Sequence, residues 1–154
     1  MKLLKQQIQP TSDTCMAACL AMILDEPVKE IIKKYHKKLM YHEIECNDVL
    51  DDYGLKYEKC YSLDQLEPKE GVFLLCVPSL NLEAINHQIV MEFTWDDNCF
   101  TIYDPNRKKM CKKYYEYGYR KTTMWRKSLK GYCIDLFISK EDLEQWRKIK
   151  LKNT

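Results

Sequence analysis

Cys15 is the residue of this 154-residue chain whose sequence surroundings best suit a chemical role. It follows the polar stretch Thr11-Ser12-Asp13-Thr14, whose first three residues are plausible helix caps, and it opens an apolar run that continues to Leu24. At a helix N-terminus the macrodipole and the free N–H groups favour an anion, so they stabilise a thiolate, the reactive form of cysteine. The sequence therefore predicts a nucleophilic thiol here. The alternative interpretation is a core cysteine in the first helical turn.

His87 and Asp104 are the candidate partners of this thiol. His87 begins a predicted strand, and imidazole is the usual base for a thiol nucleophile. Asp104 ends the next predicted strand, which pairs with the first through a short turn. Because a hairpin brings its outgoing end back beside its incoming start, Asp104 is expected near His87, where it would orient the ring. The alternatives are an edge histidine with one hydrogen bond and a turn-capping aspartate.

Gln9 lies six residues before Cys15 and could complete the site. Its amide could join the Cys15 backbone N–H in binding an oxyanion, although a solvated glutamine is the simpler interpretation. The other histidines, His36 in a Lys-rich helix and His42 near an exposed helix start, are weaker candidates for a base. No paired Cys or His residues at short spacing indicate zinc, so we expect no metal and no cofactor.

The chain order of these residues is Gln, Cys, His and Asp, and the sequences around them resemble papain-like cysteine peptidases. The resemblance is specifically to the bacteriocin-processing family that trims double-glycine leaders. It rests on four segments: QPTSDTC (9–15), ACLAMIL (18–24), NHQIVM (86–91) and IYDPN (102–106). Residues 107–154 carry no matching motif.

The resemblance implies a papain-like fold and a role for each candidate residue. Cys15 would be the nucleophile, His87 the general base and acid, Asp104 the orienting group and Gln9 the oxyanion donor. The implied activity is hydrolysis of a peptide or isopeptide bond through a Cys15 thioester. A site of this kind can also carry out transpeptidation, deamidation or acyl transfer.

The element pattern predicts an α+β protein with N-terminal helices packed on an antiparallel sheet, as one domain over residues 1–154. The first half favours helices and the second half strands. Helices are expected at 15–24, 28–38 and 42–53, a helical turn at 62–66, and a C-terminal helix from Ser139 to about Lys150. Strands are expected at 56–61, 72–77, 87–94, 98–103 and 132–139.

Composition limits the class of protein. The chain has eight cysteines without a CxxC pair, no secretory signal and no apolar stretch long enough to span a membrane, so we expect a reduced cytoplasmic protein. The resemblance implies a peptide or protein substrate. The oligomeric state is left open. Charge is uneven, because residues 107–130 hold ten basic residues and one acidic residue, interleaved with tyrosines.

Two alternatives to an enzyme stay open. Met16 stands where the resembled family usually has Gly, which favours an inert papain-like binding protein. Residues 107–130 could contact an acidic partner or nucleic acid, since lysines neutralise phosphates and rings stack on bases. An exposed loop or hairpin with a solvated face is the simpler interpretation of that segment, since it carries no named nucleic-acid motif.

Overall fold

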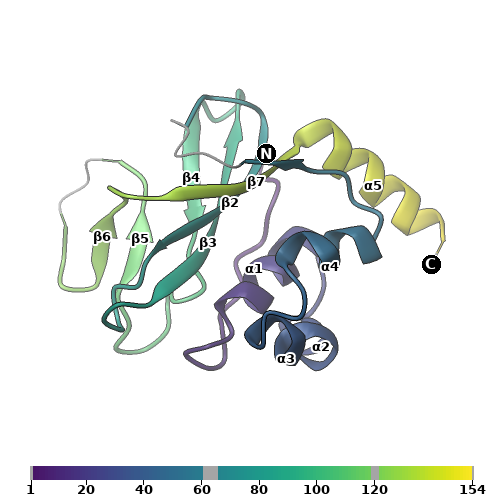
Figure 1. Cartoon of the computed structure of the whole chain (residues 1–154). Coiled ribbons are helices and arrows are strands. Elements are labelled where there is room, and N and C mark those ends of the chain that lie inside the picture. The colour runs from purple at the N-terminus through teal and green to yellow at the C-terminus, as the bar shows by residue number, and fades with distance from the viewer. Residues whose placement is uncertain (1, 61–65, 119–121, 154) are drawn as a thin grey trace.

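The computed structural model describes residues 2–60, 66–118 and 122–153 and has an α+β architecture (Figure 1). Helices from the N-terminal part of the chain pack on a five-stranded antiparallel sheet, and a further helix closes the chain. The strand order in the sheet is β1-β7-β2-β3-β4. The predicted fold class, helices first and an antiparallel sheet afterwards, is confirmed at this level.

The N-terminal helices follow the apolar pattern closely. Helix α1 (Cys15–Leu24) has the predicted bounds and is buried from Ala17 onward. Helix α2 (Val28–Ile31), a π-helical turn η1 (Ile32–His36) and helix α3 (Lys37–Met40) form one helical run that extends the predicted 28–38 helix.

Helix α4 (Cys46–Asp52) begins later than the predicted start at residue 42. His42 has a left-handed φ of 54°, which a helix cannot contain, and the helix instead starts from a capping box between Glu45 and Asp48. Its predicted end is confirmed, because Gly54 follows with a φ of 66°.

The main sheet consists of β1 (Glu58–Lys59), β2 (Gly71–Pro78), β3 (Asn86–Thr94), β4 (Cys99–Tyr103) and β7 (Cys133–Ser139). All five strands were predicted, although β1 is shorter than the expected 56–61. Most of the helical turn expected at 62–66 lies outside the described residues.

Residues 107–130, the basic segment, contribute a second, two-stranded sheet. Strands β5 (Tyr114–Glu116) and β6 (Arg126–Ser128) pair in parallel, so the segment is no simple hairpin. Helix α5 (Lys140–Lys152) ends the described chain, and the predicted Ser139 cap is confirmed because its Oγ accepts a hydrogen bond from the Asp142 N–H at 3.0 Å.

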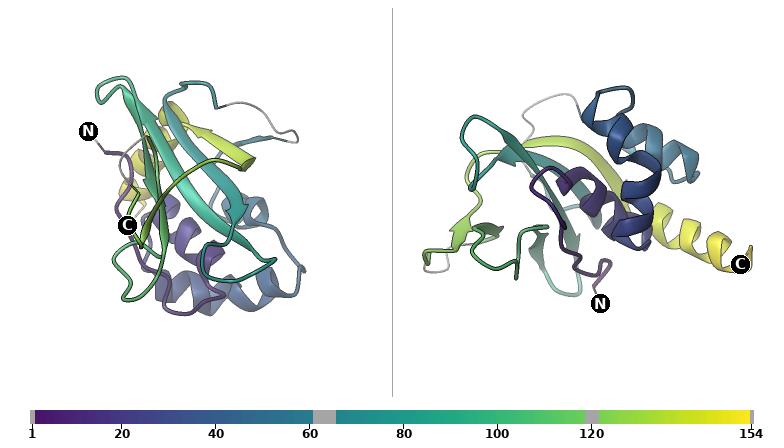
Figure 2. Two further views of the ribbon diagram at one scale, coloured as in Figure 1. Left: turned by 90° about the vertical axis from the view of Figure 1, so that its left-hand side faces the viewer. Right: turned by 90° about the horizontal axis from the view of Figure 1, so that it is seen from below.

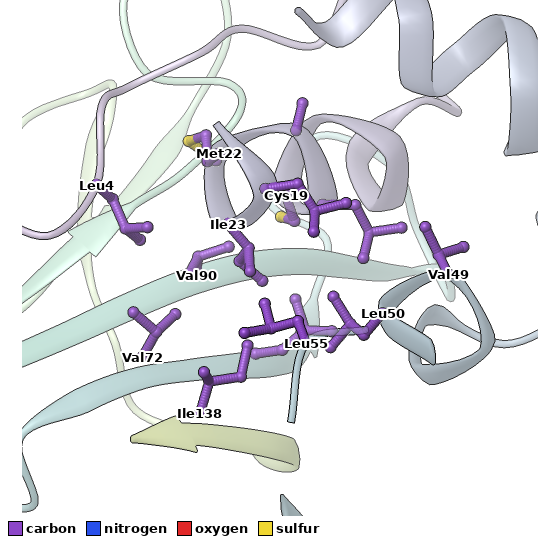
Figure 3. Packing of buried hydrophobic residues seen from close by; sticks show 14 of the residues in the cluster. Leu4, Cys19, Met22, Ile23, Val49, Leu50, Leu55, Val72, Val90 and Ile138 are labelled. Carbon is purple, nitrogen blue, oxygen red and sulfur yellow. The ribbon is translucent and has the colours of Figure 1, made fainter. Parts of the chain in front are cut away.

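Helix α1 lies against strand β3, and this contact holds the candidate site together. Figure 3 shows apolar side chains of α1, including Ile23, facing Val90 of β3 and the neighbouring strands. Within this layer, Cys19 Sγ donates a hydrogen bond to the Gln88 carbonyl oxygen at 3.3 Å. The start of α1 is thereby fixed beside the start of β3.

A second apolar cluster covers the opposite face of the sheet. It contains Ile89, Met91 and Phe93, as the alternation in β3 predicted, and it includes Tyr115 from β5. Figure 2 shows the two faces of the sheet covered by different parts of the chain. In the part of the chain that the structure describes, every helix is too short or too polar to cross a membrane.

Candidate active site

His87 and Asp104 form the buried centre of the site. His87 is the second residue of β3, and Asp104 directly follows β4. Their side chains meet through His87 Nε2 and Asp104 Oδ1 at 2.8 Å, with His87 6% exposed and Asp104 0% exposed. The antiparallel hairpin of β3 and β4 brings the two residues together across seventeen positions of sequence.

The Asp104 carboxylate is held from three sides. Besides the His87 ring, Oδ1 accepts the Asn106 backbone N–H at 2.8 Å, and Oδ2 accepts the Tyr115 backbone N–H at 2.8 Å. Asp104 thus caps its own turn and also fixes the imidazole. The contribution of Tyr115 had no sequence signal, because a backbone N–H carries no residue signature.

Cys15 lies near the His87 ring. It is a half-buried free thiol at the start of α1, and it is close enough to His87 to raise the pKa of that ring. Since Nε2 is engaged by Asp104, Nδ1 is the ring nitrogen left for the thiol. The structure therefore brings Cys15, His87 and Asp104 together in that order.

The neighbours of His87 favour its charged form. Burial on its own lowers the pKa of His87, but hydrogen bonds and charge from Asp104 and Cys15 outweigh it and raise that pKa to about 9. At neutral pH the ring is accordingly an imidazolium beside the thiol. An ion pair of sulfur and imidazolium is the reactive arrangement of a cysteine nucleophile.

The helix start is built differently from the expectation that Thr11, Ser12 or Asp13 caps it. Thr14 is the N-cap, and no side chain forms a capping hydrogen bond. Thr11 and Thr14 instead bond to each other in a tight turn, and Asp13 pairs with His36 at 3.4 Å. The first-turn N–H groups of α1 are consequently left without a side-chain cap, next to Cys15.

Gln9 is buried between the start of α1 and the Asp104 turn, at 2% exposure. Its backbone N–H donates to the Pro105 carbonyl oxygen at 3.0 Å, and its side-chain Nε2 donates to the Thr11 carbonyl oxygen at 2.8 Å. An amide nitrogen has two N–H groups, so one remains for another acceptor. The structure thus brings Gln9 to the site but turns part of its amide toward Thr11.

Residues 2–10, here called the N-terminal strap, hydrogen-bond to the turn at Asp104 and to strand β3. Gln6 Nε2 donates to the Asp104 carbonyl oxygen at 2.9 Å, close to the Gln9–Pro105 bond. Further back, the Leu3 and Leu4 N–H groups donate to the buried Glu92 carboxylate at 2.9 and 3.0 Å. No sequence motif predicts this role for residues 2–10. The only available signal was the apolar pair Leu3-Leu4.

The other candidates lie apart from this centre. His36 pairs with Asp13, and His42 is exposed. A hollow of about 450 Å³ beside α5 is lined by residues such as Tyr53 and Trp146 and contains none of the candidate residues. Among the described residues, no group of three or more His, Cys, Asp or Glu side chains could hold a metal ion.

Comparisons with protein-family models, curated proteins and solved structures found no match to this chain. The functional assignment accordingly depends on the geometry of Cys15, His87 and Asp104.

Proposed function

We propose that this protein is a cysteine hydrolase of the papain-like type, resembling the bacteriocin-processing peptidases, that cleaves a peptide or isopeptide bond. The observation that supports the proposal is the buried pair of His87 Nε2 and Asp104 Oδ1 at 2.8 Å, with the Cys15 thiol near enough to raise the pKa of the same ring. Nucleophile, base and orienting group in hydrogen-bonded sequence are what nucleophilic catalysis requires.

The reaction would proceed through a thioester. The Cys15 thiolate attacks the substrate carbonyl carbon; the C–S bond forms and the π electron pair moves to oxygen. The Cys15 N–H and the Gln9 amide would donate to that oxyanion. The oxyanion then collapses, the C–N bond breaks, and the His87 imidazolium gives its proton to the leaving amine. Water attacks the thioester and gives a proton to His87, and the C–S bond breaks to restore the thiolate.

Competitive alkylation tests the nucleophile, because exposure and activation predict opposite orders of labelling. Cys99, Cys111 and Cys133 are exposed, whereas Cys15 is half-buried. Iodoacetamide at pH 6 should nevertheless label Cys15 first if Cys15 is the nucleophile, since alkylation reports on activated thiols. Peptide mapping by mass spectrometry identifies the modified residue. Preferential labelling of the three exposed thiols would refute the proposal.

An acyl probe tests whether Cys15 forms a thioester that is then hydrolysed. With 4-nitrophenyl acetate, intact-mass analysis should show one acetyl group on Cys15 that water or hydroxylamine removes. His87→Ala should form it far more slowly, while Cys99→Ala, a matched loss of an exposed thiol, should behave like the wild type.

An inert binding protein is the second candidate function. Two observations favour it: Met16 follows the nucleophile, and Gln9 directs one amide N–H to Thr11 instead of an open site. A Cys15→Ala variant that keeps the protein's biological activity would support this second candidate over the hydrolase.

A further inference from the structure

A pocket of about 290 Å³ lies near the start of helix α1, although neither Cys15 nor His87 lines it. Two of its lining residues, Met16 and Gln88, are the chain neighbours of Cys15 and His87. The α4 region supplies Cys46, and β7 supplies Asp135 and Leu136. Cys46 also interacts electrostatically with Cys15, so a group bound in this pocket would lie in the neighbourhood of that thiol.

Asp135 reaches the pocket through an irregularity in the sheet. The pairing of β2 with β7 shifts from Leu74 opposite Leu136 to Leu75 opposite Ile134, which leaves Asp135 as an extra residue on β7. Such β-bulges are common beside active sites, where they redirect a side chain. The bulge breaks the in-and-out alternation of β7 at this carboxylate.

Gln88 fixes the Asp135 carboxylate in place. Gln88 is 8% exposed, and its Nε2 donates to Asp135 Oδ2 at 2.6 Å and to the Leu75 carbonyl oxygen at 3.0 Å. The buried Gln88 amide nitrogen thus donates to two acceptors. Partial enclosure raises the pKa of Asp135, and Glu45 raises it further against the hydrogen bond from Gln88, although the carboxylate is accessible to solvent.

Among the described residues, no basic side chain forms an ion pair with Asp135. Lys59 also lines the pocket, but it pairs with Glu45 at 3.8 Å near the exposed rim. His42 is the remaining titratable imidazole there, and it is exposed. The carboxylate held by Gln88 is therefore the negative group available to a ligand.

Four apolar residues also line the pocket. They are Met16, Leu39, Ile44 and Leu136, and they contribute hydrocarbon surface to its wall. A long methylene stem with a cationic end matches such a combination, because the stem packs on apolar walls while the charge meets the carboxylate.

We propose that this pocket binds a lysine or arginine side chain of the substrate, next to the bond that Cys15 attacks, with Asp135 as its charge partner. The inference depends on the proposed hydrolase function and names its substrate class, a basic peptide segment. Gln88 and the bulge act as positioning elements for Asp135.

Peptide vinyl sulfones test this preference. Two series, acetyl-Xaa-Gly and acetyl-Gly-Xaa, carry arginine, norleucine or glutamate at Xaa. The Cys15 thiolate adds to the vinyl carbon on the peptide side, the C–S bond forms, and the π pair moves to the carbon next to the sulfone, which takes a proton. Intact-mass analysis gives the labelling rate, and dividing by the iodoacetamide rate of the same variant removes differences in thiol reactivity.

In one of the two series, the arginine probe should label Cys15 about tenfold faster than the norleucine probe, as expected for a charge-assisted hydrogen bond to a carboxylate. Asp135→Asn should remove that preference, since the amide keeps the shape and an acceptor for Gln88 but lacks the charge. Asp96→Asn, a matched change at an exposed carboxylate on the distant β3–β4 turn, should keep it. Thermal melting establishes that each variant is folded.

The outcomes separate the two proposals. If iodoacetamide singles out Cys15 but arginine, norleucine and glutamate probes react alike, the pocket assignment is wrong and the hydrolase proposal stands. A preference for arginine that survives Asp135→Asn also overturns the role of Asp135. If iodoacetamide does not single out Cys15, both proposals fall.

Discussion

Asp104 holds His87 by Nε2, the ring nitrogen farther from the main chain, at a separation of 2.8 Å. This choice of nitrogen leaves Nδ1 as the ring nitrogen that could exchange a proton with Cys15 under the proposed function. The hydrogen bonds from Asn106 and Tyr115 prevent the carboxylate from turning away. The orientation of the base is consequently built into the backbone of the β4 turn and of β5.

Asp104→Asn should weaken both the fold and the site. The carboxylate accepts three hydrogen bonds on two oxygens, whereas an amide would place N–H groups against one of these donors. Leaving a buried donor unpaired costs about 1–3 kcal/mol, so the free energy of unfolding in urea should fall by that amount. Iodoacetamide labelling of Cys15 at pH 6 should slow in parallel. Asp96→Asn serves as the exposed control, and equal stability of the two variants would contradict this account.

The stability of the wild type should fall as pH rises from about 6.5 to about 9. The pKa of His87 is raised from 6.5 to about 9 in the folded protein, so the folded state binds the proton more tightly. The resulting stabilisation is complete below pH 6.5 and is lost as pH rises through 9; it amounts to at most about 3 kcal/mol. Urea unfolding at several pH values measures it. His87→Gln should flatten the profile over this window, and an unchanged slope would disprove the assignment.

Gln9→Ala should slow acyl transfer by Cys15 but leave the alkylation of Cys15 unchanged. Loss of one oxyanion donor reduces turnover by about 10²–10³, because the donor acts only on the charge that develops on a carbonyl oxygen. Alkylation by iodoacetamide forms no oxyanion and should stay close to the wild-type rate. Gln7→Ala is the matched control, since the Gln7 side chain bonds to Glu26 and Val28, away from the site. Equal turnover of the two variants would remove Gln9 from the mechanism.

Gly71→Ala should destabilise the sheet strongly. Gly71 has a φ of 153°, and a Cβ there would meet the Ile138 carbonyl oxygen and the Phe137 ring. Overpacking of this kind costs about 1–3 kcal/mol, and strained backbone adds to it. Gly131→Ala is the control, because a Cβ at Gly131 meets nothing within 4 Å. Similar urea midpoints for the two variants would contradict the close approach.

Helices and strands whose apolar residues recur at a regular spacing could be predicted from sequence, as α1 and β3 illustrate. Their side chains must be buried on known faces, and the turn at residues 95–98 places Asp104 beside the start of β3. The predicted start of α4 was wrong because His42, with its left-handed backbone, closes the preceding helical run, where the Glu43 N–H donates to the Lys38 carbonyl oxygen at 2.9 Å. The regular spacing of apolar residues and the residue types at the turn were thus enough to predict the positions of the candidate triad.

The supports of the site could not be predicted in the same way. The Tyr115 N–H on Asp104, the Gln9 N–H on Pro105 and the bulge at Asp135 all involve backbone groups of segments far apart in sequence. Every residue but proline offers the same N–H, so no residue type indicates such contacts. The expected cap at Thr11–Asp13 failed for a related reason, since these side chains found partners among themselves and on His36.

The separation of Cys15 from the β3–β4 hairpin has a consequence for the newly made chain. A ribosome releases the thiol long before it has synthesised His87 and Asp104, so an incomplete polypeptide exposes a cysteine with no imidazole to assist it. Under the proposed function, hydrolysis would begin only when α1 docks on β3 and would be lost with that docking. Truncated or misfolded copies would therefore lack hydrolytic activity toward the proteins around them.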